Sequence, residues 1–164
     1  YARIQAPTAK ALPRFSEWIG LSPSESPRTV PLLKAVDAAC DQGRWRSQVA
    51  VFVFESRGWT IFNDLSGYLA SISAERWKAF AGSDELIVAG YNDAVPYGQL
   101  IVVRDGNVIR EFLDDRQDPA ENVNRGELST EKRTPIKDWI AAASFVDGDD
   151  LASPPESGLL CMFG

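Results

Sequence analysis

The chain has 164 residues, of which 45 % are hydrophobic, and this size and composition suit one globular domain with its own hydrophobic core. No apolar run approaches the ~18 residues that a membrane-spanning helix needs, and the start lacks the apolar core of a signal peptide, so the sequence predicts a soluble, cytoplasmic protein. The net charge of −6 arises in residues 105–164, where thirteen Asp and Glu stand against six Lys and Arg, and such a field disfavours nucleic acid as a partner and favours a basic protein.

The first 30 residues are predicted to form a peripheral N-terminal arm. A short amphipathic piece, "RFSEWIG", offers Phe15 and Trp18 for packing, and the stretch "LSPSESPRTVP", rich in serine and proline, follows it. Next, apolar residues at helical spacing between Pro31 and Gly43 predict the first helix, with the proline near its start and the glycine as its stop.

The middle of the chain changes to a strand pattern. In "QVAVFVFESRGWTIFNDL", two runs of β-branched and aromatic residues flank the polar turn "ESRG", which predicts a β-hairpin. The segment "SAERWKAFAG" then predicts a short helix, with Ser73 as its N-cap and Gly82 as its C-cap.

A second group of strands follows this helix. The runs "ELIVAGYND", "QLIVVRD" and "NVIREFL" predict three antiparallel strands, the last two joined by the two-residue turn Asp105–Gly106. Apolar residues on both faces of the third run place it inside the sheet, with Arg110 and Glu111 as its one partly hydrated stretch.

The C-terminal part adds a helix and a last strand. The segment "TPIKDWIAAASFVD" predicts an amphipathic helix that is capped by Thr134 and turns Trp139 toward the core. The apolar tail "SGLLCMFG" predicts a docked strand or extended segment. Together the elements predict a single α+β domain over residues 1–164, with a mostly antiparallel sheet of five or six strands and flanking helices.

The sequence offers little for catalysis. The absence of histidine excludes Ser-His-Asp and Cys-His nucleophilic systems and the usual zinc sites. No nucleophile-elbow or phosphate-binding glycine motif occurs, and Cys40 and Cys161 are far apart in sequence and are interpreted as ordinary buried thiols. We therefore predict no catalytic residue, no cofactor and no enzymatic activity.

The most acidic stretch is "EFLDDRQDPAENVNRGE", residues 111–127. A calcium loop counted from Asp114 is excluded, because Arg116, Pro119 and Arg125 occupy positions that need an oxygen ligand, a glycine and a glutamate. We predict no metal site. The stretch is either the edge of a protein-binding face or a solvated loop, and the candidate contact residues are Asp114, Asp115, Asp118 and Glu121.

A second candidate contact region is "AGYNDAVPYG", which brings Tyr91, Asp93 and Tyr97 around a Pro-Gly turn. Tyrosine rings supply contact area with little loss of conformational entropy, so this turn suits a protein interface. The alternative is that the tyrosines cover the end of the sheet while Asn92 and Asp93 cap turn amides.

The order of four stretches resembles a known group of proteins. They are "GWTIFNDLSG", "ERWKAFAGSDELIVAGYNDAVPYGQLIVVRDGNVIREFLDD", "ENVNRGEL" and "IKDWIAAASFVD", within residues 48–160. In spacing and composition they resemble small acidic bacterial proteins encoded beside polymorphic or secreted toxins, which are regarded as immunity proteins, and more generally the SUKH superfamily.

The resemblance implies an intracellular binding protein that masks a cognate toxin, commonly a nuclease or a nucleotide-consuming enzyme. It implies no catalytic residue, and an acidic face would complement a basic toxin surface. Two alternatives stay open: a small enzyme that uses paired carboxylates such as Asp93 and Asp115, and a non-catalytic regulatory or scaffold domain.

Overall fold

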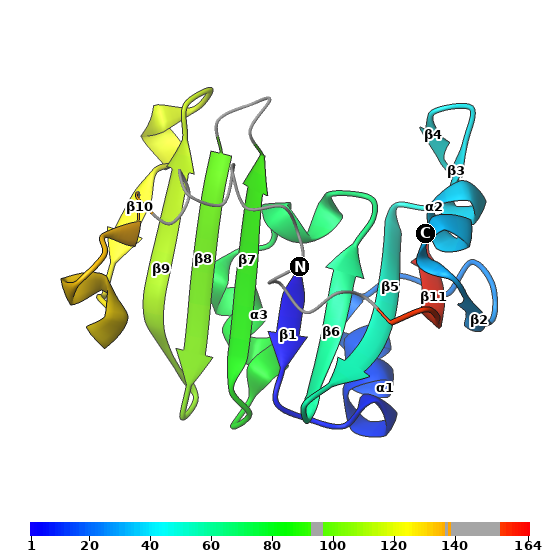
Figure 1. The fold of residues 1–164 in the computed structure, drawn as a ribbon, viewed down its shortest axis with the longest axis horizontal. Helices are drawn as coiled ribbons and strands as arrows, with labels where there is room; N and C mark the ends of the chain where they lie inside the picture. Colours follow the sequence, from blue (N-terminus) through cyan, green and yellow to red (C-terminus); the bar gives the residue numbers. More distant parts are fainter. Residues whose placement is uncertain (93–96, 137, 139–154) are drawn as a thin grey trace.

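The computed structural model describes residues 1–92, 97–136, 138 and 155–164. Nine strands of the described chain form one sheet in the order β10-β9-β8-β7-β1-β6-β5-β11-β2, and every pairing in it is antiparallel (Figure 1). The strands of this sheet are β1 (Ala2–Ile4), β2 (Arg28–Val30), β5 (Val49–Ser56), β6 (Trp59–Asp64), β7 (Leu86–Asn92), β8 (Tyr97–Arg104), β9 (Asn107–Asp115), β10 (Val123–Arg125) and β11 (Gly158–Phe163).

The helices and a small second sheet complete the described structure. They are α1 (Thr8–Ile19), α2 (Leu32–Ala39), α3 (Ala74–Ala81), the 3-10 turns η1 (Tyr68–Ser71), η2 (Pro119–Glu121) and η3 (Ser129–Lys132), and the two-stranded sheet of β3 (Cys40–Asp41) and β4 (Arg44–Trp45). The α+β prediction is confirmed, although the main sheet is larger than the five or six strands expected. Within the described residues, no helix has the length and apolarity needed to cross a membrane.

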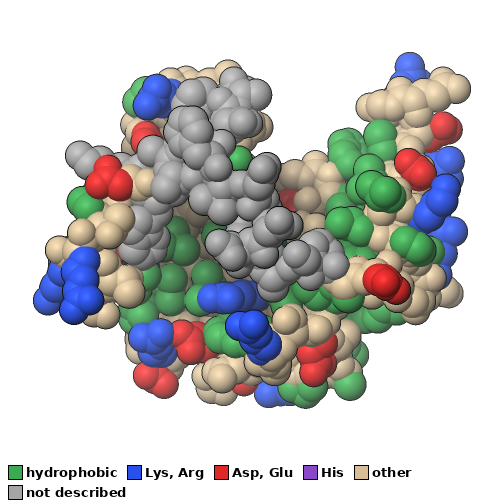
Figure 2. Space-filling view, in the orientation of Figure 1, with side chains coloured by type: hydrophobic (Ala, Val, Ile, Leu, Met, Phe, Trp, Pro, Cys, Tyr) green, Lys and Arg blue, Asp and Glu red, His purple; other side chains and the backbone are tan. Residues whose placement is uncertain are grey.

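Each face of the main sheet has its own hydrophobic cluster. In β5 the residues alternate, so that Val51 belongs to the cluster with α1 and α3 while Phe52 belongs to the cluster with α2. Figure 1 shows α1 and α3 behind the sheet. The face toward the viewer is drawn space-filling in Figure 2, where hydrophobic side chains gather over the sheet and over the region of α2.

Local signals in the sequence predicted several of these elements. Both predicted hairpins exist. The turn at Asp105–Gly106 has two residues as predicted, whereas the turn predicted over "ESRG" is shorter, because Glu55 and Ser56 still pair with β6. Arg57 and Asp105 have positive φ angles just before a glycine, as tight hairpins require. Ser73 accepts a hydrogen bond from the backbone N–H of Arg76 and caps α3 as predicted. The apolar tail forms β11, which lies between β5 and β2.

The prediction of a peripheral N-terminal arm over residues 1–30 is wrong for residues 1–20. The short strand β1 pairs with both β6 and β7 near the middle of the sheet, and Phe15 of α1 is fully buried. Three residues are too few for a period-2 pattern to be recognised, and only pairing with two distant strands makes this segment central.

The predicted hydration of Arg110 is wrong, and most of the predicted last helix lies outside the described residues. Arg110 was expected to be partly hydrated, but it is 2 % exposed, because a carboxylate from a later segment covers it. The predicted last helix falls mainly on residues outside the described part of the chain, including Trp139; Ile136 at its start is buried.

Candidate functional site

The candidate contact residues on β7 and β9 meet at one end of the sheet. In the strand register Tyr91 lies opposite Gly98, and Gly98 lies opposite Asp114. Residues directly opposite one another point to the same face of a sheet, and glycine adds no side chain between its two neighbours. Tyr91 and Asp114 therefore share the face opposite α1 and α3, and Tyr91 is 45 % exposed there.

Tyr97 belongs to the opposite face of the same sheet end. It is paired with Asn92 on β7 and with Asp115 on β9, each one residue away from the pair described above. A shift of one residue reverses the face, so Tyr97 and Asp115 lie on the side that carries α1 and α3. The structure thus divides each of the two candidate regions between the faces: Tyr91 and Tyr97 lie on opposite faces, and so do Asp114 and Asp115.

Asp115 has a structural role in the loop that follows β9. Its Oδ1 accepts hydrogen bonds from the backbone N–H groups of Gln117 (2.8 Å) and Asp118 (3.4 Å). Its own backbone N–H donates to Oδ1 of Asn122 (2.7 Å), and Nδ2 of Asn122 donates to Asp114 (3.3 Å). These contacts hold the acidic loop against the end of β9.

The remaining acidic residues of the loop face solvent. Asp118 and Glu121 are exposed, and no partner for either side chain is found within the described residues. Residues 114–122 hold four carboxylates against the single cation of Arg116, so the loop is net negative. We call this region, residues 114–122, the acidic end of the sheet. Asp93, the remaining candidate, lies outside the described residues.

A cavity of about 430 Å³ lies beside the acidic end. It is bounded by the ends of β7, β8 and β9, with Tyr97 and Asp115, and by the segment that follows β6, with Asp64. Asp64 organises that segment: Oδ1 accepts from the N–H groups of Ser66 (3.1 Å) and Gly67 (2.9 Å), and Oδ2 accepts from the N–H of Leu69 (2.8 Å). No group of three or more metal-ligating side chains is found in the described part of the chain.

Tyr97 is the polar group of this cavity with an unusual environment. Its hydroxyl oxygen is buried, and among the described residues it has no hydrogen-bond partner. Burial, and after it the negative charge of Asp115, raises the pKa of Tyr97 to about 12, so the phenol stays protonated at neutral pH.

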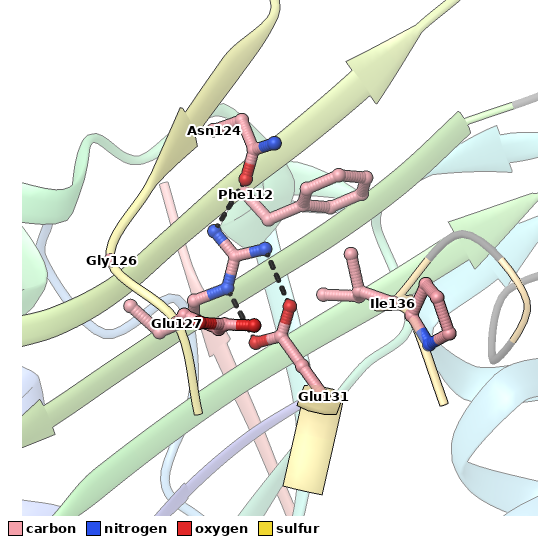
Figure 3. Close-up of a pocket in the computed structure, with 8 residues that line it drawn as sticks. Phe112, Asn124, Gly126, Glu127, Glu131 and Ile136 are labelled. Carbon is pink, nitrogen blue, oxygen red and sulfur yellow. Dashed lines mark hydrogen bonds and ion pairs between the residues drawn. The ribbon is translucent and has the colours of Figure 1, made fainter. Parts of the chain in front are cut away.

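A buried polar network that was not predicted from the sequence lies on the other face of the sheet. Nε of Arg110 donates to Oε1 of Glu131 (2.7 Å), and its second terminal nitrogen donates to Oε2 of the same carboxylate (2.9 Å). The other terminal nitrogen donates to Oδ1 of Asn124 (2.9 Å) and to the backbone oxygens of Glu111 and Arg125 (3.1 Å each). Figure 3 draws the ion pair and the contact to Asn124.

This network fastens the segment after β10 to the sheet. The backbone N–H of Leu128 also donates to Glu131 (3.1 Å), so one carboxylate joins a turn and a strand. Gly126 allows the close approach, because its φ is +71° and a Cβ there would collide with the carbonyl oxygen of Ile109. The adjoining cavity of about 510 Å³ is lined by the network itself together with Phe112 and Ile136.

The sequence held a signal for one of the missed residues but not for its partner. Arg110 stands in an otherwise apolar strand, and a charge at such a position requires a buried partner. Glu131 lies 21 residues later in a polar segment, where nothing marks it as that partner. Asp64 was also recognisable, since "NDLSG" is a typical sequence for an aspartate that accepts bonds from turn amides.

Comparison of the chain with protein-family models, with curated proteins and with solved structures found no match.

Proposed function

We propose that this protein is an immunity protein, which binds and neutralises a cognate bacterial toxin by covering a basic surface of that toxin. The observation that carries the proposal is the acidic end of the sheet, where Asp118 and Glu121 are exposed without a cationic partner in the described structure. Tyr91, which is 45 % exposed, lies two strands away from Asp114 on the same face of the sheet. A net negative surface attracts a basic protein over a distance, and an aromatic ring contributes contact area once the two meet. Cytoplasmic localisation belongs to the same proposal.

The loop geometry supports a role in binding. The bonds that Asp115 accepts from two backbone N–H groups order the loop before any partner arrives. A preordered loop loses less conformational entropy on binding, which strengthens the association. The alternative of a small enzyme pairs Asp93 with Asp115, and it remains a prediction because Asp93 lies outside the described residues. The alternative of a regulatory or scaffold domain also remains a prediction.

The test begins with the product of the gene adjacent to the one that encodes this chain. Expressed alone in a bacterial host, that product should inhibit growth, and coexpression of this chain should restore it. Binding of the two purified proteins should be measured by surface plasmon resonance at several salt concentrations. An adjacent product that neither inhibits growth nor binds would contradict the proposal.

A charge variant tests whether the acidic end is the contact surface. In the triple variant Asp114→Asn, Asp118→Asn and Glu121→Gln, the association rate at low salt should fall by about tenfold, and its salt dependence should flatten. Asp115 is left unchanged because it orders the loop.

The matched control removes the same amount of charge elsewhere. The variant Glu17→Gln, Asp37→Asn and Asp41→Asn neutralises three exposed carboxylates on α1, α2 and β3. At the same salt concentration its association rate should fall much less than that of the first variant, because the interaction between two charges weakens with the distance between them. Equal slowing by both variants would remove the acidic end from the interface.

A further inference from the structure

The cavity beside the acidic end has a distinctive charge. Among its described lining residues are the carboxylates of Asp64 and Asp115, whereas none of them is a lysine or an arginine. The two carboxylates therefore make the described lining of the cavity net negative.

The cavity also contains polar groups that can accept hydrogen bonds. Within the described residues the buried hydroxyl of Tyr97 has no hydrogen-bond partner, and such a group is destabilising unless something pairs with it. Asp115 stands directly opposite Tyr97 in the sheet, so their side chains begin ~5 Å apart. Oδ1 of Asp115 accepts hydrogen bonds from two backbone N–H groups of the loop, and in the described structure Oδ2 accepts none.

Aromatic surface lies beside these acceptors. Tyr97 supplies this aromatic surface, because its ring lies on the same face of the sheet as Asp115, whereas the side chain of Tyr91 lies on the opposite face. The volume of about 430 Å³ is within the range of small-ligand sites. A planar cation with several N–H donors can pair with a carboxylate and stack on a tyrosine ring at the same time. A compact ammonium has no flat face to stack, and an anion would be repelled.

We infer that this cavity receives the guanidinium group of an arginine side chain that the partner protein presents, with Asp115 and Tyr97 as the accepting groups. The inference rests on the proposed function, because the arginine would belong to the toxin that the protein binds. It adds to that function one specific contact between the two proteins. The recognition chemistry itself, an acidic aromatic cavity for a guanidinium group, can be tested without the toxin.

The test is calorimetric titration of the intact protein with three small probes. N-acetyl-arginine amide should bind saturably. N-acetyl-citrulline amide has nearly the same shape without the charge and should bind at least tenfold more weakly. N-acetyl-lysine amide, which is acetylated on its α-amino group, keeps a charged ε-ammonium and should also bind more weakly than the arginine probe. Equal binding of citrulline and arginine, or no saturable binding of arginine, would overturn the inference. Tighter binding of lysine would overturn the guanidinium assignment.

Two variants locate the site. Tyr97→Phe removes only the unpartnered hydroxyl and should weaken arginine binding severalfold without lowering the unfolding temperature. Asp115→Asn keeps an oxygen for the loop amides and should weaken binding at least tenfold. The control Asp37→Asn removes the same charge from an exposed position on α2 and should leave binding within twofold. Unchanged affinity in both Tyr97→Phe and Asp115→Asn would overturn the assignment of this cavity.

A fourth probe distinguishes the source of the cation. N-propylguanidine carries the same guanidinium group as a free small molecule with no second charge, and binding tighter than that of the acetylated arginine amide would assign the cavity to a small metabolite and overturn the partner-side-chain inference. None of these titrations uses the toxin, so their failure leaves the growth-rescue test of the proposed function unaffected. Conversely, failure of growth rescue would not change the measured preference for arginine over citrulline.

Discussion

Arg110 and Glu131 form a buried ion pair whose loss would leave one charge without compensation. Their side chains are 2 % and 6 % exposed, and the carboxylate accepts from both Arg110 and a turn N–H. The change Glu131→Gln should lower the free energy of unfolding by about 3–5 kcal/mol, because it leaves a guanidinium group buried opposite a neutral amide. Urea denaturation measures this. Glu127→Gln, at an exposed residue of the same cavity, should change stability by less than about 0.5 kcal/mol.

The same pair makes a prediction about pH. Burial alone raises the pKa of Glu131, but hydrogen bonds from Arg110 and Leu128, and the charge of Arg110, lower it below its ordinary value of 4.5. Because the folded pKa lies below the unfolded one, the stabilisation is complete above about pH 4.5 and is lost as pH falls through the folded pKa. The stability difference between the wild type and Glu131→Gln should therefore shrink on acidification. A difference that stays constant down to about pH 2 would show that Glu131 does not titrate in this way.

At the scale of elements, α1 is part of the hydrophobic core. Phe15 is fully buried, its ring stacks on Phe62 with centroids 4.5 Å apart, and it meets Phe80 and Phe163 at 5.8 Å. The change Phe15→Ala should destabilise the fold by about 3–5 kcal/mol in chemical denaturation, as for other buried aromatic residues. Leu33→Ala is the control, since Leu33 on α2 is 79 % exposed. A loss of stability below about 1 kcal/mol for Phe15→Ala would mean that α1 is peripheral, as the sequence predicted.

At the scale of the whole molecule, residues distant in sequence complete the sheet. β11 pairs along β5 from Leu159 opposite Val53 to Phe163 opposite Val49, and it also pairs with β2. Removal of residues 158–164 would expose the apolar edge of β5, and such edges promote aggregation. The shortened chain should aggregate and lose cooperative thermal unfolding, as measured by light scattering and circular dichroism.

A shorter truncation provides the control for this experiment. Removal of Gly164 alone eliminates one backbone hydrogen bond, to Ser22 (3.0 Å), and leaves β11 intact. That protein should stay monodisperse, with an unfolding midpoint only slightly lowered. A cooperative, non-aggregating chain after the longer truncation would mean that β11 is dispensable for the sheet.

The predictions that succeeded depended on short-range chemistry. The turn at Asp105–Gly106 and the cap at Ser73 are specified by neighbouring residues, so their sequence signals are sufficient. The candidate site was predicted less well. Which faces Tyr91 and Tyr97 occupy depends on the strand register, and a shift of one residue reverses the face, so residue type alone could not divide them.

The sequence by itself determined the α+β class, the hairpins, the capped helix α3 and an acidic segment after β9, because periodicity, turn residues and charge are local properties. Only the tertiary structure decided that β1 lies near the centre of the sheet, that Glu131 covers Arg110, and that Tyr97 and Asp115 share a cavity with Asp64. Each of these three results joins segments that are distant along the chain. Their physical cause is pairing and burial between such segments, which a local pattern does not encode.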